Sequence, residues 1–131
     1  MGGSEELSHE LIAGLGLRRG CKAAEILALV QQAGTAVGRP ISALAAPAFR
    51  RGEPGLIQAA AYLQVDLLMI DDHALHAMQP RCVTHSTLVE RAVGHSSVAE
   101  ASALAAAGPR GRLILPRIKN RSATCALAEM P

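Results

Sequence analysis

The segment that follows the first apolar run contains the side chains best suited to chemistry. Arg18, Arg19 and Lys22 lie there beside Gly16 and Gly20. Glycines let backbone N–H groups approach a ligand closely, and the start of the helix expected next carries partial positive charge. Three cations in that setting are typical of a site for phosphate or carboxylate. A sharp turn with solvated arginines explains the same residues, so both interpretations stay open.

The spacing of Gly14, Gly16 and Gly20 excludes two common phosphate-binding motifs. A dinucleotide fingerprint needs one residue fewer before its last glycine, and a P-loop needs a Gly-Lys-Ser/Thr that does not follow here. The expected anion site therefore rests on cations and backbone alone.

A second charged turn contains Arg50, Arg51 and Glu53, just before Pro54. Proline is favoured at the first position of a helix, because its missing N–H would have no partner there. A carboxylate at a glycine-flanked turn is suited to act as a general base, and Glu53 is the candidate catalytic residue. A salt-bridged helix cap is the alternative.

A third basic turn contains Arg117, Lys119 and Arg121, for which a solvated hairpin tip is the alternative to a binding role. Ser96 and Ser97 follow His95, which allows a Ser-His arrangement, although Ser97 and Glu100 also have the spacing of a capping box. Thr87 and Glu90 have that spacing too and predict a short helix that ends at Gly94.

The cysteines and histidines predict no metal site. Cys21 lies near an expected helix start, where a thiol pKa is often lowered, but a structural cysteine is the simpler interpretation. No Cys-x-x-Cys occurs, which excludes a zinc ribbon or a thioredoxin-like motif. His73 and His76 are one helical turn apart, but no clear third ligand accompanies them.

The composition indicates a single domain with an aliphatic core and argues against some classes of partner. The 131 residues are 50% hydrophobic and include only one Phe and one Tyr, so the core must be aliphatic. A net charge of +2 and so few aromatics argue against a nucleic-acid partner. No apolar run is long enough to span a membrane and no signal peptide is visible, so we expect a cytoplasmic protein.

Hydrophobic periodicity predicts alternating strands and helices. The expected strands are 11–17, 41–46, 65–70, 112–115 and 124–127. The expected helices are 23–33 with Gly34 as its cap, 54–63, 72–78 and 98–107. The largely apolar strand 65–70 suggests burial on both faces, and the last two strands suggest an antiparallel edge hairpin.

This order of elements predicts an α/β fold with a largely parallel sheet that is covered on both sides. Ligands of such sheets bind at the carboxyl ends of the strands. The turns at 18–19 and 50–53 are therefore expected on the same rim.

Taken in order, these segments resemble the CobE family of cobalamin biosynthesis, which matches the C-terminal domain of CbiG proteins. The segments that carry the resemblance are 14–20, 53–56, 93–101, 113–119 and 124–128. Many relatives have a lysine before the Glu-Pro-Gly segment and another near Pro116. Here Arg50, Arg51 and Arg117 keep the charge but change the geometry.

The resemblance implies a three-layer α/β/α domain with a mixed, mostly parallel sheet of about five or six strands. It divides the chain into a flexible lead-in, 1–10, and the family domain, 11–131. It implies a role in forming the corrin ring of vitamin B12. CbiG proteins open a lactone of a precorrin and release acetaldehyde, but this chain is too short for the other CbiG domains.

We therefore expect a protein that binds a precorrin or corrinoid intermediate, without a cofactor, metal, nucleic acid or membrane. Its arginines would bind the acetate and propionate groups around the ring. The alternatives are a hydrolase with Glu53 as base and an accessory subunit of another pathway enzyme. The expected substrate-binding residues are Gly16, Arg18, Arg19, Gly20, Arg50, Arg51, Ser96, Ser97 and Lys119.

Overall fold

The structure, a computed structural model, describes residues 10–84 and 97–131. In these two segments it contains a five-stranded sheet with the order β3-β2-β1-β5-β4. The strands are β1 (Glu10–Leu17), β2 (Ala43–Pro47), β3 (Asp66–Ile70), β4 (Arg112–Lys119) and β5 (Ala123–Met130). The pairs β1–β2 and β2–β3 are parallel, whereas β5 runs antiparallel to both β1 and β4. Every strand but β5 therefore points in one direction, which confirms the expected mixed, mostly parallel sheet.

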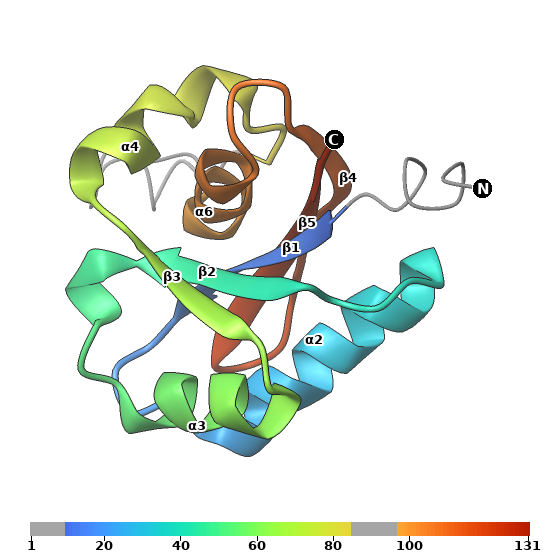
Figure 1. The fold of residues 1–131 in the computed structure, drawn as a ribbon. Helices are drawn as coiled ribbons and strands as arrows, with labels where there is room; N and C mark the ends of the chain where they lie inside the picture. The colour runs from blue at the N-terminus through green and yellow to red at the C-terminus, as the bar shows by residue number, and fades with distance from the viewer. Residues whose placement is uncertain (1–9, 85–96) are drawn as a thin grey trace.

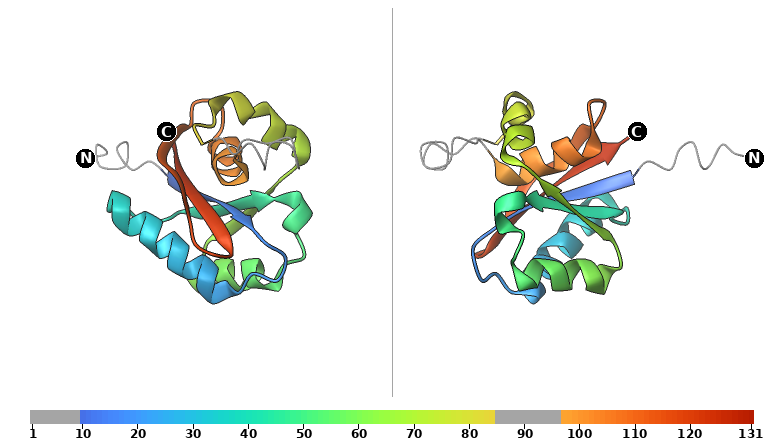
Figure 2. Two further views of the ribbon diagram at one scale, coloured as in Figure 1. Left: turned by 180° about the vertical axis from the view of Figure 1, so that it is seen from behind. Right: turned by 60° about the vertical axis from the view of Figure 1, so that its left-hand side comes forward.

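Helices cover both faces of this sheet. They are α2 (Ala23–Val37), α3 (Pro54–Leu63), α4 (Asp72–Ala77) and α6 (Val98–Ala107), with 3-10 turns η1 (Ala48–Arg50) and η2 (Gln79–Arg81). Figures 1 and 2 show α2 and α3 against one face, and α6 with α4 beside it against the other. The three-layer α/β/α prediction is confirmed.

The two faces of the central strand β1 pack against different helices. Leu11 and Leu15 belong to the cluster that includes the buried residues of α2 and α3, whereas Ile12 packs with residues of α6. On the α6 face, a Cβ at Gly14 would lie 2.1 Å from the carbonyl oxygen of Ala99. The glycine therefore lies inside the strand and lets the α6 backbone pack directly on the sheet.

The end of α2 differs from the prediction. Gly34 lies within the helix, and the cap is Gly38, which has a φ of 69°. The N–H of Gly38 donates to Gly34 O at 2.8 Å and to Thr35 O at 3.2 Å. Of these two glycines only Gly38 adopts the left-handed conformation that ends a helix in this way, so the choice of Gly34 was wrong.

The sheet order corrects two further expectations. β3 is an edge strand, so its segment Leu67–Ile70 is only partly buried, and the prediction of burial on both faces was wrong. β4 and β5 do form the expected antiparallel hairpin. However, only β4 lies at the edge, because β5 pairs along its whole length with β1 and is almost fully buried.

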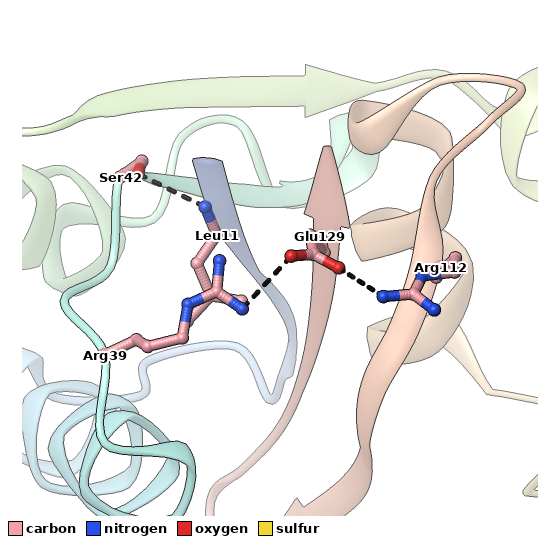
Figure 3. Close-up of polar contacts among 5 residues, drawn as sticks. All are labelled: Leu11, Arg39, Ser42, Arg112 and Glu129. Carbon is pink, nitrogen blue, oxygen red and sulfur yellow. Dashed lines mark hydrogen bonds and ion pairs between the residues drawn. The ribbon is translucent and has the colours of Figure 1, made fainter. Parts of the chain in front are cut away.

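Polar contacts tie the elements together at the end of the sheet where β1 begins and β5 ends. The Glu129 carboxylate accepts from Arg112 at 2.8 Å and from Arg39 at 3.3 Å (Figure 3). Leu11 and Ser42 exchange hydrogen bonds beside them, from Leu11 N to Ser42 Oγ and from Ser42 N to Leu11 O. This cluster joins β4, β5, β1 and the residues before β2.

Candidate functional site

The two basic turns meet at the carboxyl ends of β1 and β2. Arg50 Nε donates to Leu17 O at 2.8 Å, and Gly20 N donates to the Glu53 carboxylate at 2.7 Å. Gly20 has a φ of 81°, a conformation that glycine adopts without strain. Since β1 and β2 run parallel, these turns lie on the same rim, as the sequence predicted.

The tip of the β4–β5 hairpin joins that rim. Arg18 N donates to Ser122 O at 3.0 Å. The Asn120 amide oxygen accepts from Ser122 N and Ala123 N, while its amide nitrogen donates to Glu25 O in α2 at 3.1 Å. Hydrogen bonds therefore hold the third basic turn beside the first.

A cleft of about 580 Å³ lies between these turns and the start of α6. Its lining consists of Gly16, Leu17, Arg18, Pro47, Phe49, Arg50, Ser97, Val98, Arg117, Lys119, Asn120, Arg121, Ser122, Ala123 and Thr124. Among these described residues five are cationic and none is acidic. From β1 the chain continues to β2 and β3 on one side of the sheet, whereas β5 and β4 lie on the other side. The cleft lies at this change of direction, which is the usual ligand site of an open α/β sheet.

Gly16 and Thr124 both line the cleft and pack against each other. A Cβ at Gly16 would lie 2.6 Å from the Thr124 hydroxyl oxygen, so the glycine makes room for that side chain. The Thr124 hydroxyl donates to Gly16 O at 3.4 Å. Gly16 thus has a packing role in addition to its place in the lining.

Phe49 adds an apolar surface to this basic cleft. The residue is 51% exposed, and the Arg50 guanidinium lies 5.1 Å from the centre of the Phe49 ring. An exposed aromatic ring beside a guanidinium suits a ligand that is both flat and anionic. The sequence hint was weak: Phe49 is the chain's only phenylalanine and precedes two arginines.

The structure brings together only some of the predicted site residues. Gly16, Arg18, Arg50, Ser97 and Lys119 line the cleft. The lining does not include Arg19, Gly20, Arg51 or Glu53. Ser96 lies outside the described residues, as do His95 and the predicted helix 87–94.

The Ser97 hydroxyl caps α6 and accepts from Glu100 N at 3.2 Å, which confirms the capping interpretation of Ser97. The other half of the predicted capping box was wrong, because the Glu100 carboxylate bonds to other segments. One of its oxygens accepts from Val83 N and Thr84 N, both at 2.9 Å. The other accepts from the Thr84 hydroxyl at 2.6 Å and from Arg117 N at 3.0 Å.

Glu100 is fully buried, yet its carboxyl has a lowered pKa. Burial by itself would raise the pKa of the Glu100 carboxyl, but the hydrogen bonds from Thr84, Arg117 and Val83 outweigh burial and lower the pKa below its ordinary value. These hydrogen bonds of Glu100 were missed from the sequence alone, because their donors lie 16 and 17 residues away in the chain.

The described cysteines are free thiols in buried positions. Burial, followed by the charges of Glu25 and Glu53, raises the pKa of Cys21. Burial also raises the pKa of Cys82 to about 11 and that of Cys125 to about 12. The nucleophile alternative for Cys21 therefore has no support, because a reactive thiol needs a lowered pKa.

We accordingly expect all three thiols to react slowly with a disulfide reagent at pH 8 in the native protein and rapidly in guanidinium chloride. The Cys82 thiol, for example, has a pKa of about 11, so roughly one molecule in a thousand has it ionised at pH 8. Stopped-flow absorbance with Ellman's reagent measures both rates, and Cys21→Ser identifies the signal of Cys21. A fast native reaction that disappears in Cys21→Ser would contradict this expectation.

Two other classes of site are absent from the described residues. Within residues 10–84 and 97–131 no three His, Cys, Asp or Glu side chains are grouped so that they could hold a metal ion. Nor does any helix of these segments have the length and apolar character needed to cross a membrane.

Comparison with known proteins gives consistent matches. The family model for the cobalamin synthesis G C-terminus matches residues 11–128. Protein CobE of a Sinorhizobium species is 36% identical over 124 residues, which cover 90% of this chain and 79% of that protein.

Solved structures of cobalamin biosynthesis proteins are also similar to this chain. A crystal structure of CobE, described as a protein from the cobalamin (vitamin B12) biosynthetic pathway, is 38% identical with a TM-score of 0.86, covering 94% of this chain and 92% of the other. The cobalamin biosynthesis protein chiG from Agrobacterium tumefaciens is 35% identical with a TM-score of 0.73, covering 90% and 96%.

A cobalamin biosynthesis protein G homologue from Sulfolobus solfataricus is 22% identical with a TM-score of 0.75, and shares the fold. The match covers 94% of this chain but 37% of that longer protein. The family model matches residues 11–128, and three relatives above 30% identity are covered over most of their length. The chain therefore belongs to the CobE family of cobalamin biosynthesis proteins, which corresponds to the C-terminal domain of CbiG.

Proposed function

We propose that this cobalamin-pathway protein binds a polycarboxylate precorrin or corrinoid intermediate in the cleft at the carboxyl ends of the strands. The observation that supports the proposal is the charge of the lining: five cations and no acidic residue among its described residues. Corrin precursors are flat rings with acetate and propionate groups at their edge. Arginine binds such carboxylates through paired, charge-assisted hydrogen bonds.

The arrangement of the lining suits the shape of such a ligand. Arg18 and Arg50 follow β1 and β2, whereas Arg117 and Lys119 belong to β4, so cations from several elements line the cleft and could bind several edge carboxylates at once. Phe49 offers a ring for contact with the flat face. An open cleft at the rim receives one side of a macrocycle and leaves the other accessible, which is what a protein that presents an intermediate to an enzyme requires.

The test is a spectroscopic titration with two corrins that differ in charge. Cobyrinic acid has free acetates and propionates, whereas cyanocobalamin has amides in their place. We expect cobyrinic acid to bind with micromolar affinity that weakens steeply as salt rises, and cyanocobalamin to bind much more weakly. Equal binding of the two corrins, or binding that salt does not affect, would contradict the proposal.

Product analysis of the same mixtures separates a carrier from an enzyme. In the structure the Glu53 carboxylate bonds to Gly20 N, and Glu53 is not part of the cleft lining. We therefore propose binding rather than hydrolysis as the function of the cleft. A new corrin product that the Glu53→Gln variant fails to form would favour the hydrolase. Co-purification with another pathway enzyme, without affinity for corrins, would favour an accessory subunit.

A further inference from the structure

Glu100 joins three segments that are distant in sequence. It lies in the first turn of α6, and its carboxylate accepts from Val83 and Thr84, just beyond η2, and from Arg117 in β4. Val98 at the start of α6 and Arg117 in β4 both line the cleft. The carboxylate thus connects two elements that line the cleft, α6 and β4.

β4 is irregular at the point where Glu100 contacts it. Leu115 pairs with Leu127 and Ile118 pairs with Cys125, so β4 has one residue more than β5 between these pairs. Such a bulge re-aims the side chains of its strand and leaves an N–H without a partner in the ladder. Pro116 has no N–H, and that of Arg117 donates to Glu100 at 3.0 Å.

We propose that Glu100 is a positioning residue for the cleft, which fixes the bulged main chain at Arg117 against the start of α6 so that the cationic lining is formed before the ligand binds. The inference rests on the proposed function, since it assigns a role in binding the same ligand. Pre-formed donors bind an anion more tightly, because the cost of ordering them has already been met in folding.

The chemistry of the site calls for a carboxylate. An ionised carboxylate only accepts hydrogen bonds, and its two oxygens match the four donors found here. Glutamine has nearly the same volume, but its amide nitrogen is a donor. In Glu100→Gln, whichever way the amide turns, donors would face backbone N–H groups of Arg117 or of Val83 and Thr84.

A matched pair of variants tests this role. Glu100→Gln and Glu129→Gln make the same change at a buried carboxylate, but Glu129 lies at the other end of the sheet. In the cobyrinic acid titration we expect Glu100→Gln to weaken binding by roughly tenfold or more and Glu129→Gln by less than about twofold. Equal losses in the two variants, measured while both are folded, would overturn the inference.

A double-mutant cycle with Arg117→Gln separates positioning from general destabilisation. If Glu100 acts through Arg117, the losses of affinity overlap, and the double variant binds about as well as Arg117→Gln alone. Full additivity of the two losses would overturn the role. Amide exchange measured by NMR without ligand adds a second readout, in which Arg117 N–H is protected in the parent and exposed in Glu100→Gln.

Thr84→Val supplies a milder variant if Glu100→Gln does not fold. It removes one hydrogen bond to the carboxylate oxygen that also accepts from Arg117, and we expect a loss of about threefold in affinity. Unchanged affinity in folded Thr84→Val would overturn the inference. A parent chain that does not bind cobyrinic acid would overturn the proposed function and this inference together, whereas a binding parent with an unaffected Glu100→Gln would overturn this inference alone.

Discussion

Gly14→Ala is expected to destabilise the fold by about 3 kcal/mol, because α6 leaves no room for a methyl group on β1. A Cβ at this position would lie 2.1 Å from Ala99 O and 2.4 Å from Ala103 N. Both atoms belong to the helix backbone, so the contact cannot be relieved by a side-chain rotation. The helix would have to move away from the sheet and lose part of its packing against Ile12 and its neighbours.

Equilibrium unfolding in urea, followed by far-UV circular dichroism, measures this effect. Gly52→Ala is the matched control, because nothing lies within 4 Å of a Cβ there and its φ is not positive. We expect the control to change the free energy of unfolding by less than about 0.5 kcal/mol. A Gly14→Ala protein as stable as Gly52→Ala would show that α6 does not pack on β1 as described.

Arg18→Glu is expected to weaken binding of cobyrinic acid by about a hundredfold. Arg18 lines the cleft, and the change replaces a donor to carboxylates with a like charge that repels them. A hundredfold loss corresponds to about 2.7 kcal/mol of binding free energy. The main-chain hydrogen bond from Arg18 N to Ser122 O does not depend on the side chain, so the turn is expected to persist.

Arg19→Glu is the matched control for this prediction. It makes the same change in net charge at the adjacent residue, whose side chain is exposed and not part of the cleft lining. We expect a loss of less than about fivefold, since exposed charges beyond contact distance are screened by salt. Titration of both variants at the same ionic strength measures the difference. Equal losses would mean that the ligand responds to the overall field and does not contact Arg18.

The sequence by itself determined the order of the elements and most of their types. The apolar run 11–17, Pro54 at a helix start and Ser97 as an α6 cap were each readable from local chemistry, and the structure confirms them. That the two arginine turns share a rim also followed, because the carboxyl ends of parallel strands meet at one edge of a sheet.

Only the tertiary structure decided which cations line the same cleft and which hydrogen bonds hold their segments in place. Arg18 and Arg19 are alike in sequence, yet one lines the cleft and the other does not, because the chain turns at Arg19 and Gly20, where Cys21 N donates to Arg18 O at 3.1 Å. The position of β5 beside β1 brought Lys119 and Arg117 to the same cleft. A capping-box spacing for Glu100 concealed a buried carboxylate that joins α6 to β4, since hydrogen bonds between segments far apart in the chain leave no local pattern in the sequence.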